Sequence, residues 1–296
     1  MTEGTSPAPL TGVVVIDLGQ IYQGPYATFL MARAGADVIK VEPLTGEPLR
    51  RRESEGVGPS FPLAFLNSNK RAVTLNLKEE RGRELLRTMV ERADVLLENF
   101  APGVMDRLGV GARELMELNP RLVYASGTGF GLSGPDRDRL AMDVTIQASA
   151  GVMSITGTPE APPMRAGPAM ADFLGGVHLY GAVVTALFDR SRSGRGCLVE
   201  VAMQETVYPT LLSDLGLQYR AGGEQAPRRG NRHGAVAPYN VYATRDGHIA
   251  LICTADSHWQ SLLEAMGRQD LADDPRFSTT SLRAENEAAT DEAVGE

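Results

Sequence analysis

The segment GVVVIDLGQIYQGPYATFLMARAGADVIKVE, residues 12–42, decides the fold of this chain. Its start, residues 12–18, is a nearly continuous apolar run, which is typical of a strand buried on both faces of a parallel sheet. A turn over 20–25 leads into a predicted helix over 26–33, and a second strand follows over 36–42. Strand, helix and strand in this order form a βαβ unit. The sequence therefore predicts an α/β protein, and the turn at 20–25 is expected to form one wall of a site beyond the carboxyl ends of the strands.

Similar patterns continue along the chain beyond this unit. The stretch 79–91 predicts a charged amphipathic helix whose Leu85, Leu86 and Val90 face inward. Further apolar runs predict strands at 72–77, 93–98, 121–126 and 198–202. We therefore expect residues 1–220 to form one large domain around a parallel sheet.

Composition and charge exclude several classes of protein. With 43% hydrophobic and 22% charged residues the chain is typical of globular proteins, and its net charge of −8 argues against general nucleic-acid binding. No run of about 18 apolar residues occurs, so no membrane span is expected. Cys197 and Cys253 lie far apart, and residues 1–9 lack the basic and apolar regions of a signal peptide, so we expect a cytoplasmic protein. The histidines are scattered, so no metal site is expected: His178, His233, His248 and His258.

A glycine-rich segment, GTGFGLSG at 127–134, follows the predicted strand at 121–126. Its glycines satisfy the G-x-G-x-x-G pattern of dinucleotide-binding proteins. However, Pro135 stands where that pattern needs close helix packing, and the window 148–158, about 20 residues further on, holds no acidic residue to bind a ribose. The segment is better explained as a glycine-rich active-site loop or as turn chemistry.

Asp172 stands at the head of a predicted buried helix within Pro168–Gly196. The helix has one apolar stripe, formed by Phe173, Val177, Tyr180, Val184 and Leu187. Asp172 is expected at the N-cap, beside free backbone N–H groups and the positive end of the helix dipole. On the residues alone, it either caps a buried helix or serves as a nucleophilic carboxylate.

The composition changes after the large domain. Residues 221–236 are polar and basic and are interpreted as a linker. The runs 239–242 and 248–253 are predicted to pair as a hairpin, and 257–266 to form a helix. Residues 237–296 are therefore expected to begin a smaller α+β domain that is incomplete at its C-terminus.

Motifs in both parts of the chain resemble the class III CoA-transferase family, which also contains α-methylacyl-CoA racemases and formyl-CoA transferases. The matching pieces occur in order as VIDL (15–18), QGP (23–25), GADVIKVE (35–42), NKR (69–71), DVLLENF (94–100), PG (102–103), DRLG (106–109), LNPR (118–121), AD (171–172), TAL (185–187), GRG (194–196), VAMQ (201–204) and GNRHG (230–234). The resemblance implies a Rossmann-like large domain, a small domain, an interlocked homodimer and full chains longer than this one. It also implies acyl-CoA and carboxylic acid substrates and no tightly bound cofactor.

Asp172 matches the catalytic aspartate of that family, which favours the nucleophile over the cap. A carboxylate with an ordinary pKa of about 3.9 is ionised at neutral pH and needs no general base. In the family mechanism the aspartate attacks the donor thioester to form a mixed anhydride, the released CoA converts this to an aspartyl-CoA thioester, and the acceptor acid reverses the steps. The backbone N–H of Gln23 and the glycines of 127–134 are expected to stabilise the oxyanions.

The resemblance also implies roles for other residues. Gln20 and Tyr22 are expected to line the acyl pocket, and Asp143 matches an acidic position near the active site, although it equally suits a helix N-cap. The CoA contacts are expected to come from Leu75, Asn99, Phe100, Arg107 and Met203.

The sequence departs from two branches of the family. Racemases have a histidine where this chain has Met142, which cannot shuttle a proton. Formyl-CoA:oxalate transferases have a glutamine at Tyr22 and basic CoA contacts at Pro43 and Leu140. We therefore expect an acyl-CoA:carboxylate CoA-transferase whose basic groups come from elsewhere, such as Lys70, Arg71 or Arg139. The alternatives are an α-methylacyl-CoA racemase or epimerase and a truncated CoA-binding subunit that is inactive alone.

Overall fold

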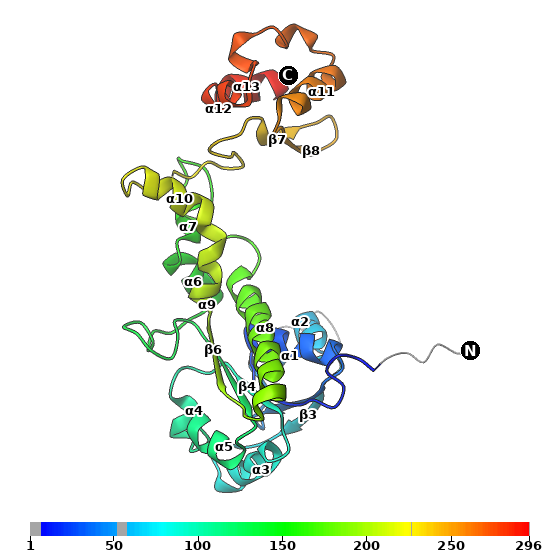
Figure 1. Ribbon diagram of the computed structural model, residues 1–296, viewed down its shortest axis with the longest axis vertical. Helices are drawn as coiled ribbons and strands as arrows, with labels where there is room; N and C mark the ends of the chain where they lie inside the picture. Colours follow the sequence, from blue (N-terminus) through cyan, green and yellow to red (C-terminus); the bar gives the residue numbers. More distant parts are fainter. Residues whose placement is uncertain (1–6, 52–57, 226, 296) are drawn as a thin grey trace, which may run out of the picture. The chain divides into compact units, whose positions relative to one another are not determined.

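In the computed structural model, residues 7–51, 58–225 and 227–295 are described, and they divide into two compact units (Figure 1). Unit 1 contains the described residues up to Val152 together with Ala166–Ser213. Unit 2 contains Met153–Arg165 and the described residues from Asp214 on. Each unit has a hydrophobic core of its own.

Unit 1 is built on a six-stranded sheet in the order β3-β2-β1-β4-β5-β6. Every strand pair is parallel. The strands are β1 (Val14–Asp17), β2 (Asp37–Glu42), β3 (Arg71–Thr74), β4 (Val95–Glu98), β5 (Val123–Thr128) and β6 (Leu198–Ala202). This order is that of a doubly wound fold, in which the strand order reverses between β1 and β4. The predicted α/β class with a parallel sheet is confirmed.

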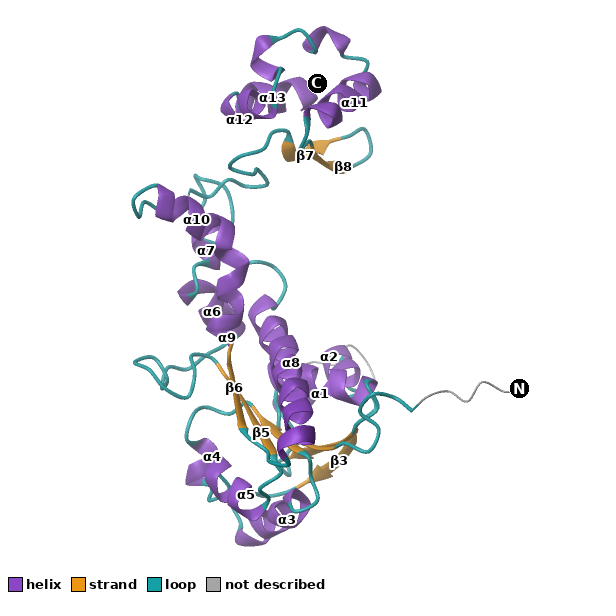
Figure 2. Ribbon diagram, in the orientation of Figure 1, coloured by secondary structure: helices purple, strands orange, loops and turns teal. Residues whose placement is uncertain are grey.

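Helices cover both faces of this sheet (Figure 2). On one face, α1 (Gln23–Arg33) and α8 (Met170–Ser193) pack on the strands through Met31, Leu179 and Val183. On the other face, the second core includes Leu86, Met105 and Leu115. These residues belong to α3 (Glu80–Val90), α4 (Val104–Arg107) and α5 (Ala112–Leu118). The loops after β1 and β4 therefore leave toward opposite faces, which opens a crevice at the carboxyl edge of the sheet.

Unit 1 also contains several shorter elements. They are η1 (Pro48–Arg51), α2 (Phe61–Leu66), α6 (Asp143–Ser149), α9 (Met203–Val207) and η2 (Tyr208–Leu211). Two helices, α7 (Val152–Ile155) and α10 (Leu212–Arg220), run across the boundary between the units. The stretch Met203–Arg220 is helical throughout, but Pro209 lies in a 3₁₀ turn that separates α9 from α10.

The predicted apolar stripe of α8 is confirmed in part, because Tyr180, Val184 and Leu187 pack against the core. Phe173 and Val177 are 36% and 41% exposed, whereas the buried residues are Ala171, Gly175, Gly176, Leu179, Val183, Ala186 and Arg190. Gly176 lets α8 approach α1 closely, since a Cβ there would lie 2.8 Å from the carbonyl oxygen of Gln23, and Phe173 and Val177 lie at the margin of the contact. By length and composition, α8 is also the one helix in the described part of the chain that could cross a membrane. Its packing on the sheet is that of a core helix.

Unit 2 contains the predicted hairpin, formed by β7 (Tyr239–Ala243) and β8 (His248–Ile252) in antiparallel register. The helical elements are α11 (Asp256–Met266), η3 (Gln269–Leu271), η4 (Pro275–Phe277), α12 (Thr280–Glu285) and α13 (Glu287–Gly295). Trp259, Leu263 and Phe277 form the centre of its small core. Arg283 is fully buried beside Trp259 and donates hydrogen bonds to the carbonyl oxygens of Ala237 and Phe277. The boundaries 221–236 and 237–296 for linker and small domain stay predictions.

Candidate active site

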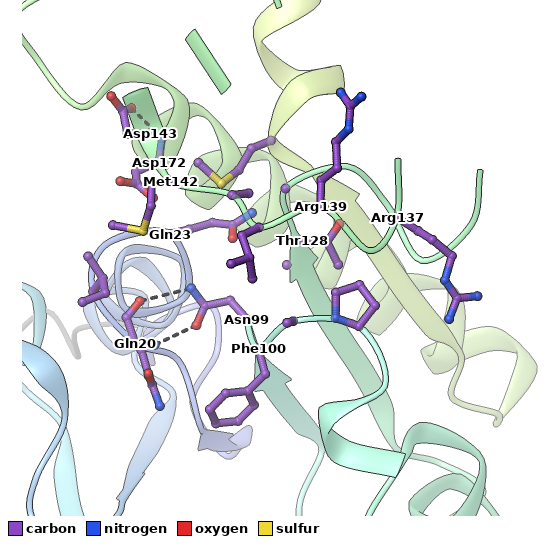
Figure 3. Close-up of a pocket in the computed structure, with 18 residues that line it drawn as sticks. Gln20, Gln23, Asn99, Phe100, Thr128, Arg137, Arg139, Met142, Asp143 and Asp172 are labelled. Carbon is purple, nitrogen blue, oxygen red and sulfur yellow. Dashed lines mark hydrogen bonds between the residues drawn. The ribbon is translucent and has the colours of Figure 1, made fainter. Parts of the chain in front are cut away.

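A cavity of about 180 Å³ opens at the carboxyl edge of the sheet in unit 1 (Figure 3). Its walls come from the loops after β1, β4 and β5, from the segment 137–143, from the first turn of α8 and from the start of α9. It is lined by Gln20, Ile21, Gln23, Asn99, Phe100, Ala101, Pro102, Gly127, Thr128, Gly129, Arg137, Arg139, Leu140, Ala141, Met142, Asp143, Asp172 and Met203. Because β1 and β4 are the strands between which the sheet order reverses, the cavity occupies the usual ligand position of a doubly wound fold.

The loop after β1 is held by side chains from other elements. Asn99 accepts a hydrogen bond from the N–H of Gln20 at 2.7 Å and donates one to the carbonyl oxygen of Gln20 at 3.1 Å. Glu47 accepts from the N–H of Ile21 at 3.2 Å. Ile21 has a φ of +63°, a left-handed conformation that a β-branched residue adopts only under strain. The surrounding hydrogen bonds therefore impose the shape of this wall.

Buried charges lie beneath the same loop. The Asp17 carboxylate accepts from Lys70 Nζ at 2.9 Å and from the Thr28 hydroxyl at 2.7 Å. Lys40 Nζ donates to the carbonyl oxygen of Gly19 at 2.7 Å. Burial opposes ionisation of Asp17, but Lys70 and Lys40 outweigh it and lower its pKa. The ionised cluster ties the ends of β1 and β2 to the loop.

Asp143 positions the backbone that carries Asp172. Asp143 Oδ1 accepts from the N–H of Ala171 at 2.8 Å and from that of Asp172 at 3.3 Å. Its other oxygen accepts from Gln147 Nε2 at 2.7 Å, and Gln147 is fully buried. The predicted N-cap role of Asp172 is wrong, because α8 begins earlier, with Ala169 at its N-cap. Asp172 lies in the first turn instead, and Asp143 supplies the acceptor for the first N–H groups.

Glu98 supports the Phe100 side of the cavity. It is 5% exposed, and its Oε2 accepts from the N–H of Phe100 at 2.8 Å. Burial, with a smaller contribution from Asp106, raises the pKa of Glu98 to about 7 although hydrogen bonds from Ser126 and Phe100 oppose the shift. This carboxyl therefore titrates near neutral pH.

The structure brings together most of the residues singled out from the sequence. The cavity is lined by Gln20, Gln23, Asn99, Phe100, Asp143, Asp172 and Met203. Three others lie outside its lining. Tyr22 stacks on Phe173 with ring centroids 5.8 Å apart, Leu75 belongs to the core, and Arg107 is exposed on α4. The assigned roles of all ten residues stay predictions.

Two arginines of the cavity wall and one buried glutamine are not among the ten site residues predicted from the sequence. Of the three residues expected to supply basic groups for CoA, Lys70 and Arg71 lie outside the cavity lining, paired with Asp17 and Asp37, and only Arg139 lies in the wall. Arg137 lies in the wall beside Arg139. Their position in the loop after a parallel strand could have indicated both. Gln147 carries no signal that distinguishes it from an ordinary polar helix residue. Within the described residues, no group of three or more metal-ligating side chains occurs.

Comparison with known proteins agrees with this geometry. The sequence model of CoA-transferase family III matches residues 10–296. The acyl-CoA transferase of Fusarium pseudograminearum is 38% identical over 293 residues, which are 95% of this chain and 64% of that protein. The acetyl-CoA:oxalate CoA-transferase of Acetobacter aceti is 38% identical over 304 residues, which cover 99% of this chain and 77% of that protein.

A solved structure with a similar fold agrees with these sequence matches. The crystal structure of a CaiB/BaiF family protein from Brucella suis has a TM-score of 0.87 and 35% identity, and covers 98% of this chain and 78% of that one. This chain thus spans 64% to 78% of the lengths of these relatives. The match over nearly the whole sequence and the shared fold show that the chain belongs to CoA-transferase family III.

Proposed function

We propose that the protein transfers CoA from an acyl-CoA to a carboxylic acid, with Asp172 as the nucleophile. Family membership supports the reaction class. The observation that carries the assignment of the nucleophile is the position of Asp172, in the cavity at the switch point of the sheet and on backbone held by Asp143. Asn99, Phe100 and Met203 line the same cavity and suit the CoA chain.

The first half of the reaction uses no general base. A carboxylate oxygen of Asp172 bonds to the thioester carbonyl carbon, the C–S bond breaks, and CoA leaves as the thiolate. The thiolate then attacks the Asp172 carbon of the mixed anhydride and releases the donor acid as its carboxylate. An aspartyl-CoA thioester remains, and charge is conserved in each step.

The second half repeats these steps with the acceptor acid. Its carboxylate attacks the aspartyl thioester and expels the CoA thiolate. The thiolate attacks the acceptor carbon of the new anhydride, which gives the product acyl-CoA and restores the Asp172 carboxylate. The first turn of α8 favours that negative charge through the helix dipole. The first turn of α1, which begins at Gln23, offers backbone N–H groups that have no partner inside the helix.

Asp172→Ala tests the proposal. We expect a loss of CoA transfer of at least about 10³-fold, since the covalent step has no substitute. Acetyl-CoA incubated with the unmodified protein should leave a CoA adduct on the peptide containing Asp172, as measured by mass spectrometry. Asp189→Ala is the matched control, because Asp189 is exposed at the far end of the same helix. Retained transfer in Asp172→Ala would disprove the assignment.

The racemase alternative has less support. Its proton relay needs a histidine beside Asp143, and Met142 occupies that place in the cavity wall. Exchange of deuterium into the α-carbon of an acyl-CoA without CoA transfer would favour a racemase instead.

We also propose that the protein acts as a cytoplasmic homodimer. An exposed row of aromatic rings supports the dimer: Phe61 is 79% exposed and Phe65 is 47% exposed, and Phe65 packs against Phe29 with ring centroids 5.0 Å apart. Such patches are uncommon on monomers. Light scattering should give twice the 31.7 kDa chain mass, and Phe61→Ser should weaken the dimer. A monomer at micromolar concentration would contradict this assembly.

A further inference from the structure

The side-chain amide of Gln23 is buried without a hydrogen-bond partner. Gln23 is the first residue of α1, is 2% exposed and lines the same cavity as Asp172. Its Nε2 has no hydrogen-bond acceptor among the described residues. A buried donor without an acceptor costs stability, so its presence in a folded protein requires an explanation, and a catalytic role is one.

Two glycines leave the space that this amide occupies. A Cβ at Gly127, in β5, would lie 2.9 Å from Gln23 Oε1 and 3.1 Å from Nε2. A Cβ at Gly175, in α8, would lie 2.9 Å from the same Nε2. The two distances of 2.9 Å are shorter than real Cβ contacts, so a side chain at either position would displace the amide. The space for the amide therefore depends on both residues being glycine.

The same contacts place the donor near Asp172. Gly175 follows Asp172 by three residues on α8, and residues at that spacing share one face of a helix. The amide that contacts Gly175 therefore lies against the face of α8 that carries Asp172. In Figure 3 the Gln23 side chain lies between Asp172 and Thr128, within the lining of the cavity.

We propose that Gln23 Nε2 donates a hydrogen bond to the carbonyl oxygen of the acyl group that Asp172 attacks. This rests on the proposed function. As the new C–O bond forms, the carbonyl oxygen gains negative charge, and a fixed donor in a site that excludes water stabilises that charge without reorganisation. Every acyl-CoA has this oxygen, so Gln23 acts as a catalytic residue for all substrates and does not select among them.

A spectroscopic test separates this role from the role of Asp172. In the Asp172→Ala background no covalent step occurs, and bound acetyl-CoA labelled with ¹³C at its carbonyl can be observed by isotope-edited infrared spectroscopy. We expect a carbonyl band at lower frequency than in free acetyl-CoA, and a return toward the free value in Asp172→Ala with Gln23→Met. An identical band in both proteins would overturn the role of Gln23. Failure to bind acetyl-CoA at all would overturn the proposed function as well.

Kinetics provide the second test. Removal of one oxyanion donor lowers kcat by about 10²- to 10³-fold. We expect a loss of this size in Gln23→Met with acetyl-CoA and with succinyl-CoA alike, and little change in KM. Gln23→Glu keeps the volume of the side chain but removes the donor and adds a negative charge, so it should be no more active than Gln23→Met. Gln218→Met, in unit 2, is the control substitution. A loss confined to succinyl-CoA, or a change in KM alone, would overturn the proposal.

Discussion

At the scale of single residues, Asp143 positions Asp172 by accepting hydrogen bonds from the backbone at the start of α8. In Asp143→Ala, the N–H groups of Ala171 and Asp172 lose their acceptor. Loss of a helix-capping acceptor costs about 1 kcal/mol of stability, and the shifted backbone should misplace Asp172 and lower kcat. Thermal unfolding and initial rates measure the two effects. Asp143→Asn keeps an oxygen at this position and should retain more activity; equal losses in both variants would argue against a positioning role.

Glu98 gives the protein a pH-dependent stability. Its pKa is about 7 in the folded protein, against an ordinary value of 4.5, so between these values the folded protein holds a proton that the unfolded chain releases. The stabilisation is complete below pH 4.5 and is lost as pH rises through 7. The shift corresponds to about 3 kcal/mol.

Denaturant unfolding at pH 5 and pH 8 can isolate this contribution by comparing the unmodified protein with Glu98→Gln. The variant keeps an oxygen for the N–H of Phe100 but has no charge to bury. We expect its stability to vary less between the two pH values, by about 3 kcal/mol at most. The same pH dependence in both proteins would show that Glu98 is ionised throughout.

At the scale of elements, two glycines of α8 allow a matched comparison. Gly181 is exposed, and a Cβ there would meet no atom within 4 Å, so Gly181→Ala should stabilise the helix by about 1 kcal/mol. Gly175→Ala should lose that gain, because its Cβ would displace the Gln23 amide, and its activity should fall. Thermal unfolding and rates of both variants test this. Equal stabilisation and full activity in Gly175→Ala would contradict the packing described.

The strands were predictable because apolar runs in a parallel sheet are buried on both faces. The run 198–202 coincides with β6, and 36–42 differs from β2 by one residue. The buried stripe of α8 was predictable only in part, because four of its seven buried residues are alanine or glycine. Hydrophobic periodicity has no signal for small residues at a close helix contact.

The sequence predicted several residues that line the site, but it did not predict the hydrogen bonds that join them. Strand ends and motifs pointed to Asp172, Asn99 and Gln20, and all three line the cavity. The hydrogen bonds between Asn99 and the backbone of Gln20 join residues 79 positions apart. The hydrogen bond from the N–H of Ala171, at the start of α8, to Asp143 joins residues 28 positions apart. No local pattern records such pairs, since they depend on tertiary placement alone.

At the scale of the whole molecule, the two units should unfold in separate transitions. Each has its own core, and Trp259, the single tryptophan of the chain, is buried in the core of unit 2. Tryptophan fluorescence should therefore follow unit 2, whereas circular dichroism follows both units. Leu86→Ala removes a fully buried side chain from unit 1 and should cost about 2 to 5 kcal/mol there, with little change in the fluorescence midpoint. A fluorescence midpoint that moves equally would show that the units unfold together.

The anchoring of the loop after β1 has a consequence for how this protein can diverge. Asn99 and Glu47 hold that loop through backbone atoms of Gln20 and Ile21, and both anchors lie outside it. Mutations that exchange the side chains at 20 and 22 therefore leave the path of the main chain intact. During evolution, the side chains beside the cavity can therefore be substituted one at a time. Each successive variant keeps a folded site on which selection can act.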